Sequence, residues 1–258
     1  MNKKMLITGA SRGIGKAIAL HFAKKGYELV LAARTESDLK SVALECKSLG
    51  AKTYYVIADF SDMANVKEVV DEIQKTFPNI TNLVLNAGIS TSVSFEDNSY
   101  DQIKRELDIN YLSPVYIIKE YIPILKKVGG GNIICISSFG AIVPFPGNSS
   151  YAASKAALYS LCTSLKIELE PYNIHVGCVL PGTTKTEMTK QFHDTPFVPF
   201  DDPSEIAQCV EDSIHKKEAV VIPGILYNAA ALTYKLFPKP IDFLMSLAAK
   251  SILPTLKK

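Results

Sequence analysis

The sequence has little net charge, no CxxC pair of cysteines and no apolar run of membrane-spanning length. Its formal charge is only +2 over 258 residues, so nothing in the composition favours nucleic-acid binding. The five cysteines form no CxxC pair and mostly lie in apolar runs, which is typical of reduced core residues in an intracellular protein. The longest charge-free apolar run, Ala219 to Tyr234, is broken by Pro223 and Gly224, so no membrane span is expected.

A signal peptide is also hard to accommodate. The basic start MNKK is followed only by MLI before Thr8 and Gly9, so cleavage after a full apolar region would destroy the glycine-rich segment that follows. We therefore expect a cytoplasmic protein.

Short apolar runs alternate with longer amphipathic segments along most of the chain. Hydrophobic residues make up 47% and charged residues 21%, the balance of a globular protein with a sizeable core. Continuous apolar strands separated by helices imply a parallel sheet covered on both faces. With no repeat or linker, we expect one three-layer, doubly wound α/β domain of the Rossmann type over residues 1–258, with about seven strands. The expected strands are 4–8, 28–33, 53–58, 82–86, 132–137, 175–180 and 219–222, and the expected helices are 13–25, 36–48, 62–76, 99–127, 150–170 and 203–216.

Two regions fall outside this alternation. Residues 183–202 are rich in Thr and Pro and are interpreted as a substrate flap over the strand ends. Its apolar members, Met188, Phe192, Phe197 and Phe200, favour either a pocket for a lipophilic substrate or plain loop packing. Residues 225–258 form an apolar extension of two helical patterns split by FPKP and flanked by lysines. A cap over the pocket or a subunit interface is favoured there over a peripheral membrane contact.

The first strand runs into the glycine-rich stretch TGASRGIG, which then opens a helix. Glycine lets the backbone turn sharply, and it lets a pyrophosphate approach the N–H groups of a helix N-terminus. The spacing is G-x3-G-x-G rather than G-x-G-x-x-G, but its place between strand and helix predicts a dinucleotide site. The predicted contacts are Gly9, Ser11, Arg12, Gly13, Ile14 and Gly15.

The end of the second strand indicates which dinucleotide binds. An acidic residue there would bind the adenosine ribose and repel a 2′-phosphate, but the sequence reads LAARTES, with Arg34 and no acid at the strand tip. Arg12 is a second cation that could reach the same phosphate. These arginines favour NADP(H), the alternative being that both are solvated surface residues.

The third and fourth strands also end in candidate cofactor contacts. Asp59 could accept a hydrogen bond from the adenine amino group, or could cap the helix that begins in DFSD. The fourth strand ends in Asn86, Ala87 and Gly88, whose small side chains would leave room for the adenosine half of the cofactor.

Ser138, Tyr151 and Lys155 form the candidate catalytic set. Ser138 follows the fifth strand, at the edge where doubly wound sheets bind ligands. Tyr151 and Lys155 are four apart, on one face of a helix. Reduction of a ketone needs a proton for its oxygen, and we expect Lys155 to favour the phenolate and so lower the pKa of Tyr151 from its ordinary value of about 10. Tyr159 has no lysine four residues later and is predicted to be structural.

Together, TGASRGIG, NAG, the Ser138, Tyr151 and Lys155 set, and Pro181-Gly182 resemble the compact branch of the short-chain dehydrogenase/reductase family over roughly residues 4–222. The resemblance implies a nicotinamide cofactor and interconversion of carbonyls and alcohols. It also implies that Ser138 polarises the substrate oxygen, that Tyr151 is the acid/base, and that Lys155 holds the nicotinamide ribose. No metal is expected.

Further site residues come from the resemblance alone. Asn110, in LDIN, matches a residue that helps place a water in a proton relay behind the lysine. The stretch PGTTKT resembles the segment that lines the nicotinamide, with Thr186 at the usual threonine. Thr184 stands where the family usually has an apolar residue, and Leu85 where it often has a second Asn before NAG.

The leading interpretation is an NADPH-dependent reductase of ketones or aldehydes, and the apolar flap residues favour a lipophilic substrate. A 3-oxoacyl-(acyl carrier protein) reductase is an alternative within the family, and a non-catalytic NADP(H)-binding sensor or scaffold is an alternative outside enzymes. By resemblance, the protein would be a homodimer or homotetramer.

Overall fold

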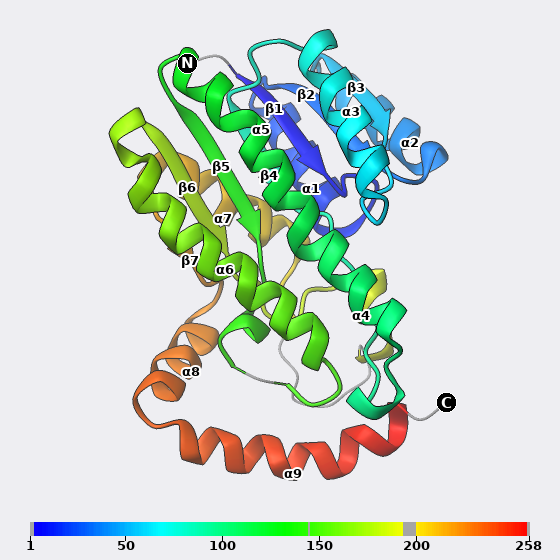
Figure 1. Ribbon diagram of the computed structural model, residues 1–258, viewed down its shortest axis with the longest axis vertical. Helices are drawn as coiled ribbons and strands as arrows, with labels where there is room; N and C mark the ends of the chain where they lie inside the picture. The colour runs from blue at the N-terminus through cyan, green and yellow to red at the C-terminus, as the bar shows by residue number, and fades with distance from the viewer. Residues whose placement is uncertain (1–2, 144, 193–199, 257–258) are drawn as a thin grey trace.

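The structure is a computed structural model that describes residues 3–143, 145–192 and 200–256 (Figure 1). Seven strands form one parallel sheet in the order β3-β2-β1-β4-β5-β6-β7, which confirms the predicted fold class. The strands are β1 (Lys4–Thr8), β2 (Glu28–Ala33), β3 (Thr53–Ile57), β4 (Asn82–Leu85), β5 (Gly131–Ile136), β6 (Ile174–Val179) and β7 (Val220–Val221). All were expected from their apolar runs, within two residues at each end.

Helices cover both faces of this sheet (Figure 1). On one face lie α1 (Gly13–Lys24), α2 (Glu36–Ser48) and α7 (Pro203–Lys216), and on the other lie α3 (Met63–Thr76), α5 (Ser113–Lys127) and α6 (Ser149–Leu169). Each face has its own buried apolar cluster, with Ile18, Val42 and Val210 in the first and Val66 and Leu158 in the second. Burial on both sides explains why the strands read as unbroken apolar runs rather than as alternating ones.

The single helix predicted over 99–127 is wrong, because the structure breaks it into three parts. After α4 (Tyr100–Leu107), residues Asp108–Leu112 form a π turn, and α5 then begins at Ser113. Pro114 has no N–H to donate to the carbonyl four residues earlier, and the Ser113 N–H instead reaches back five residues to the Asp108 carbonyl. The Ser113 hydroxyl donates to the Ile109 carbonyl at 3.0 Å, which satisfies the acceptor that the shift leaves over.

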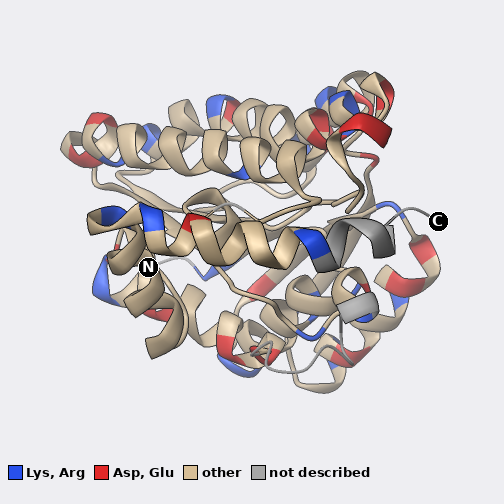
Figure 2. Ribbon diagram, turned by 90° about the horizontal axis from the view of Figure 1, so that it is seen from below, with Lys and Arg blue, Asp and Glu red and all other residues tan. Residues whose placement is uncertain are grey.

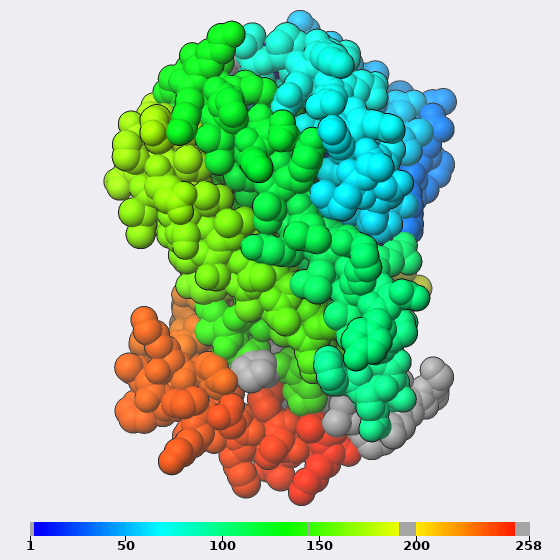
Figure 3. Space-filling view, in the orientation of Figure 1, coloured from blue at the N-terminus to red at the C-terminus, as the bar shows by residue number. Residues whose placement is uncertain are grey.

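The C-terminal extension forms the two helices that the sequence predicted, α8 (Ile225–Leu236) and α9 (Pro238–Leu256), divided at Phe237. They cross the end of the molecule toward which the strands point (Figures 1 and 3). The α9 stretch between Asp242 and Lys250 carries no charge, and in Figure 2 this helix runs across the view as a mostly uncharged element. Ile225 and Leu226 are strongly exposed. The predicted tail residues Ile252, Leu253, Lys257 and Lys258 lie outside the residues whose side chains are described.

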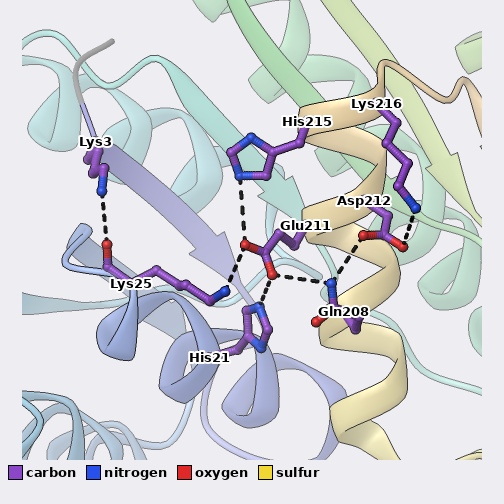
Figure 4. Close-up of polar contacts among 8 residues, drawn as sticks. All are labelled: Lys3, His21, Lys25, Gln208, Glu211, Asp212, His215 and Lys216. Carbon is purple, nitrogen blue, oxygen red and sulfur yellow. Dashed lines mark hydrogen bonds and ion pairs between the residues drawn. The ribbon is translucent and has the colours of Figure 1, made fainter.

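A cluster of charged side chains joins α1 to α7, which lie 190 residues apart in sequence at His21 and Glu211 (Figure 4). Glu211 accepts a bond from His21 at 2.8 Å and pairs with Lys25 at 3.1 Å and with His215 at 3.7 Å. Only 13% of the Glu211 side chain is exposed. Burial opposes ionisation of this carboxyl, but the bonds from His21 and Lys25 outweigh it and lower the pKa of Glu211.

We expect Glu211→Gln to lower the free energy of unfolding by about 1–2 kcal/mol at pH 7, because it removes the charge that His21 and Lys25 face. The folded pKa of Glu211 lies below its ordinary value of 4.5, so its contribution is complete above that pH and is lost as the pH falls through the folded pKa. The two proteins should therefore converge in acid, measured by urea unfolding over a range of pH. Asp212→Asn is the matched control, because Asp212 pairs with the exposed Lys216 one helical turn away, and it should cost less than about 0.5 kcal/mol.

Candidate active site

A cavity of about 560 Å³ lies at the carboxyl ends of the strands, and we call it the strand-end cavity. It contains nearly the whole set of predicted site residues, which come from segments spread over almost 180 positions of sequence. Those that line it are Gly9, Ser11, Arg12, Gly13, Ile14, Arg34, Asp59, Asn86, Ala87, Gly88, Ser138, Tyr151, Lys155, Pro181, Gly182, Thr184 and Thr186. Gly15 and Asn110 lie behind its wall rather than in its lining.

The glycine turn leaves the N-terminus of α1 open toward this cavity. Gly9 and Gly13 adopt φ angles of +65° and +53°, which favour glycine. Gly15 is required by space, because a Cβ there would lie 2.1 Å from the Gly9 carbonyl oxygen. The N-cap residue Arg12 makes no side-chain capping bond, and the first turn of α1 contains no acidic residue. The helix dipole and its N–H groups are therefore available to an anion.

Asn86 does more than leave room for a cofactor, because it braces the glycine turn. Its Nδ2 donates to the carbonyls of Thr8 and Gly9, both at 3.1 Å. In return, the Thr8 hydroxyl accepts bonds from the N–H groups of Asn86 and Ala87 at 3.0 and 3.1 Å. These bonds join the ends of β1 and β4, and the sequence analysis missed the part played by Thr8.

At the end of the cavity nearest β2 and β3, Arg12 and Arg34 are both exposed to solvent and both contribute to the lining. Asp59 accepts bonds from the hydroxyl and N–H of Ser61 at 2.7 and 2.9 Å. Those bonds, helped by the charge of Arg34, lower the pKa of Asp59. The alternative that Asp59 caps the next helix is wrong, because Asp62 is the N-cap of α3 and accepts from Ala64 at 2.9 Å.

Ser138 and Lys155 are both held by backbone contacts around the tip of β5. The Ser138 Oγ accepts a bond from the Gly140 N–H at 3.1 Å, which fixes the oxygen, and the Ser138 hydroxyl also hydrogen-bonds the Tyr151 phenol. Lys155 is buried, and its Nζ donates to the Ile136 carbonyl at 2.9 Å. The Ser137 hydroxyl donates to the Lys155 carbonyl at 2.8 Å, so residues at the end of β5 bond both the side chain and the backbone of Lys155.

The pKa of Tyr151 is raised in this structure, not lowered as the sequence analysis expected. The lysine Nζ lies 5.9 Å from the centre of the Tyr151 ring. Burial raises the pKa of the phenol, the Ser138 hydroxyl opposes that rise, and the charge of Glu106 adds to it. Burial also lowers the pKa of Lys155 to about 8. Tyr151 is therefore a neutral phenol here, ready to donate a proton rather than to accept one.

Asn110 sits in the π turn and connects the loop after β4 to α6. Its Oδ1 accepts from the Ile89 N–H, and its Nδ2 donates to the Ile89 carbonyl and to the Ser154 hydroxyl, all at 2.9 Å. A Cβ at Gly88 would lie 3.1 Å from the Lys155 Nζ and 3.2 Å from the Asn110 Oδ1, so both side chains crowd the same glycine. The structure thus brings Asn110 to the lysine, and its part in a proton relay stays a prediction.

Glu106 is the functional candidate that sequence reasoning missed at this end of the cavity. It is fully buried, and it accepts bonds from the N–H and hydroxyl of Thr91 at 2.7 and 2.9 Å and from the Ser150 hydroxyl. Ser150 immediately precedes Tyr151, so this carboxylate anchors the first turn of α6. Nothing in the stretch KREL distinguishes Glu106 from a solvated helix residue, because its partners come from 15 and 44 residues away.

The remaining sequence predictions can now be placed. Tyr159 packs against the hydrophobic core and does not line the cavity, as expected of a structural residue. In the predicted flap, Met188 lines the cavity, and a Cβ at Gly13 would lie 3.1 Å from Thr186, so this segment crosses the glycine turn. Phe197, and the side chain of Phe192, lie outside the described residues.

The short chain dehydrogenase family model matches residues 3–196. The chain belongs to this family. It is an oxidoreductase by that membership, and members of the family bind a nicotinamide dinucleotide.

Individual relatives extend this likeness over most of the chain. A relative from Arabidopsis thaliana named 11-beta-hydroxysteroid dehydrogenase-like 2 is 35% identical over 249 residues, which cover 94% of this chain and 80% of the relative. A short-chain dehydrogenase from Sphingobium yanoikuyae, solved in complex with NADPH, has a TM-score of 0.82 at 29% identity, covering 94% of this chain and 95% of that one. The bulky-bulky ketone specific alcohol dehydrogenase from Comamonas testosteroni has a TM-score of 0.80 at 27% identity and covers 95% of each chain.

We expect Glu106→Gln to shift the pH dependence of the reaction when it runs in the direction that consumes a proton. That direction needs the protonated Tyr151 phenol, so its rate falls as the pH rises through the phenol pKa. Removing the Glu106 charge lowers that pKa, and the alkaline limb of kcat/KM should move to lower pH. Asp101→Asn, an exposed acid on the same helix, is the control and should leave the limb in place. An unmoved limb in Glu106→Gln as well would mean that Glu106 acts on folding alone.

Proposed function

We propose that the protein is an NADPH-dependent reductase that transfers hydride to a ketone or aldehyde carbonyl, with alcohol oxidation as the reverse reaction. The main support for this proposal is that one cavity contains both the candidate cofactor-binding residues and the candidate catalytic residues. The open N-terminus of α1 lies at one end of it, and Ser138, Tyr151 and Lys155 lie at the other. A purely structural role for a Tyr-x3-Lys pair would not require a shared cavity with an anion site.

The residues present fit a nicotinamide dinucleotide. The glycine turn offers backbone N–H groups to a pyrophosphate, and Ala87 and Gly88, with little or no side chain, line the same cavity. Lys155, beside Gly88, would hold the nicotinamide ribose. The bound cofactor supplies the hydride, which the protein itself cannot provide.

The protein's own residues then handle the substrate oxygen. The Ser138 O–H donates to that oxygen and holds it, because its own oxygen is fixed by the Gly140 N–H. Tyr151 delivers the proton as negative charge develops, and its raised pKa keeps it protonated until then. Lys155 carries its charge more fully once the phenolate forms, because an adjacent anion favours the ammonium. Regaining the proton from solvent returns Tyr151 to its starting state.

The preference for NADP(H) is supported by the cations at the adenosine end. Arg12 and Arg34 both line the cavity, and β2 ends in Ala33 with no acidic side chain at its tip. A guanidinium pair is well suited to a 2′-phosphate dianion. The complex of the Sphingobium yanoikuyae relative with NADPH supports the same choice.

A lipophilic substrate is supported by apolar residues in the lining of the cavity. Ile89, Ile109 and Met188 are among them. The names of the relatives, one a hydroxysteroid dehydrogenase-like protein and one an alcohol dehydrogenase specific for bulky-bulky ketones, also favour a lipophilic substrate.

We further propose that the protein is a homo-oligomer in the cytoplasm. No helix among the described residues is long and apolar enough to cross a membrane.

We expect Tyr151→Phe to bind NADPH with nearly normal affinity but to lose at least about 100-fold in turnover, because it keeps the ring and removes the proton donor. NADPH oxidation across ketones, aldehydes, quinones and 3-oxoacyl thioesters measures this loss, and cofactor fluorescence measures binding. Tyr159→Phe, two turns along the same helix, is the control and should behave as the parent protein.

Equal turnover by Tyr151→Phe and the parent would contradict the mechanism. Turnover confined to 3-oxoacyl thioesters would favour the acyl carrier protein reductase instead, and NADPH binding without any turnover would favour a sensor or scaffold.

We expect Arg34→Asp to change the ratio of kcat/KM for NADPH over NADH by about 100-fold toward NADH, since a charge-assisted contact is replaced by repulsion of the 2′-phosphate. Steady-state kinetics with each cofactor measure the ratio. Lys40→Asp makes the same change of charge at an exposed position of α2 and should alter the ratio far less. An unchanged ratio in Arg34→Asp would refute the phosphate contact.

A further inference from the structure

Tyr227, on the C-terminal extension, packs against the segment that forms one wall of the strand-end cavity. Tyr227 lies in the first turn of α8, directly after two residues that face solvent: Ile225 is 88% exposed and Leu226 is 71% exposed. Tyr227 itself is half-buried, and Ala231, one helical turn later, is buried. These two residues form the inward face of an otherwise exposed helix.

The Tyr227 ring packs directly on Gly182. A Cβ built at Gly182 would lie 2.0 Å from the tyrosine Cζ, 2.2 Å from its Cε2 and 2.5 Å from its hydroxyl oxygen. No side chain fits in that space, so the residue before Thr183 must be glycine for as long as Tyr227 is in place. Gly182 is not needed here for an unusual backbone angle, because its φ does not fall in the left-handed region.

The Tyr227 hydroxyl completes the hydrogen bonding of the same segment. It accepts a bond from the Thr183 N–H at 3.0 Å, while the Thr183 carbonyl accepts from the Asp201 N–H at 2.8 Å. Both backbone groups of Thr183 are thereby satisfied by residues that follow it in sequence. Losing the tyrosine oxygen would leave a partly buried N–H without this partner, which is costly.

The same ring also contacts the segment that carries Ser138. The centres of the Phe139 and Tyr227 rings lie 5.0 Å apart at an angle of 59°, a favourable aromatic geometry. The Phe139 N–H donates to the Pro181 carbonyl at 2.8 Å. Tyr227 therefore sits at the junction of the two strand ends that present Ser138 on one side and Pro181-Gly182 on the other.

We propose that Tyr227 is a positioning residue for the active site, through which the C-terminal extension holds the wall formed by Pro181, Gly182 and Thr183 in register with Ser138. This inference rests on the proposed function for its catalytic consequence, but not for its packing consequence. It assigns to the extension a role in the catalytic geometry of its own chain. It also explains why an apolar, largely exposed helix is attached at this point of the molecule.

Tyr227→Ala tests the catalytic consequence. Catalysis depends on placing the reacting groups within fractions of an ångström, so kcat should fall by about 10-fold or more. The dissociation constant for NADPH, measured by cofactor fluorescence without substrate, should rise by less than about fivefold, because the glycine turn and arginines at the other end of the cavity remain. Tyr227→Phe keeps the ring and removes the hydroxyl that accepts the Thr183 bond, so it should lie between the parent and Tyr227→Ala.

Tyr234→Phe is the matched control. Tyr234 lies on the same helix, but its phenol interacts with Asp242 of α9 and not with the cavity wall. It should leave kcat and cofactor binding unchanged. A Tyr227→Ala protein with a lower melting temperature but an unchanged kcat would show a merely structural tyrosine and would overturn the proposal.

A double-mutant cycle with Gly182→Ala tests the packing without any substrate. Alone, Gly182→Ala should reduce both thermal stability and NADPH binding, because its methyl group collides with the tyrosine ring. In the Tyr227→Ala background the collision is gone, and the same substitution should cost little further stability or affinity. Equal losses in both backgrounds would refute the contact. Because the cycle is read from unfolding and cofactor binding, it remains decisive even if the protein reduces no carbonyl, which separates failure of this inference from failure of the proposed function.

Discussion

Burial of the Lys155 ammonium is the constraint on which the catalytic end of this structure depends. A cation removed from water is costly unless it is paired or hydrogen-bonded, and here its bond goes to the Ile136 carbonyl at the tip of β5. That bond connects α6 to the end of β5. Gly88, in the segment after β4, lies close to the same group, since a Cβ there would lie 3.1 Å from the lysine Nζ. The glycine of NAG thus leaves room for the buried charge of Lys155.

The same crowding accounts for the π turn. Asn110 must face Lys155 and Gly88 while bonding to both backbone groups of Ile89 and to Ser154. A continuous helix over 99–127 would rotate it relative to α4, whose Glu106 anchors the start of α6. The extra residue of the π turn lets α4 and α5 each present the required side chain, and Pro114 stabilises the break by withholding a donor. A local irregularity of the backbone therefore serves two polar contacts at once.

This explains which features the sequence could predict. The strand positions and the identity of the cavity residues follow from local patterns, because apolar runs define strands and strand ends in a parallel sheet must meet at one edge. The π turn escaped because Pro114 reads equally well as the start of a helix. Glu106 and Tyr227 escaped because their importance lies in partners 44 residues away in sequence, with no local motif at either end. The effect on Tyr151 had the wrong sign because spacing along a helix reports proximity, whereas the pKa also depends on burial and on Glu106.

The position of Tyr227 changes how the C-terminal extension should be studied. Its exposed apolar residues, such as Leu232 and Phe243, are compatible with a subunit interface or a lipid surface, and shortening the chain at Gly224 would be a natural way to remove them. That truncation would also delete the side chain that packs on Gly182, so a loss of activity would follow from damage to the cavity wall alone. Substituting the outward residues of α8 and α9 while keeping Tyr227 and Ala231 separates the two effects, because these substitutions preserve the contact between Tyr227 and Gly182. The two faces of one helix thus divide the extension into a part that shapes the cavity and a part free to meet a partner.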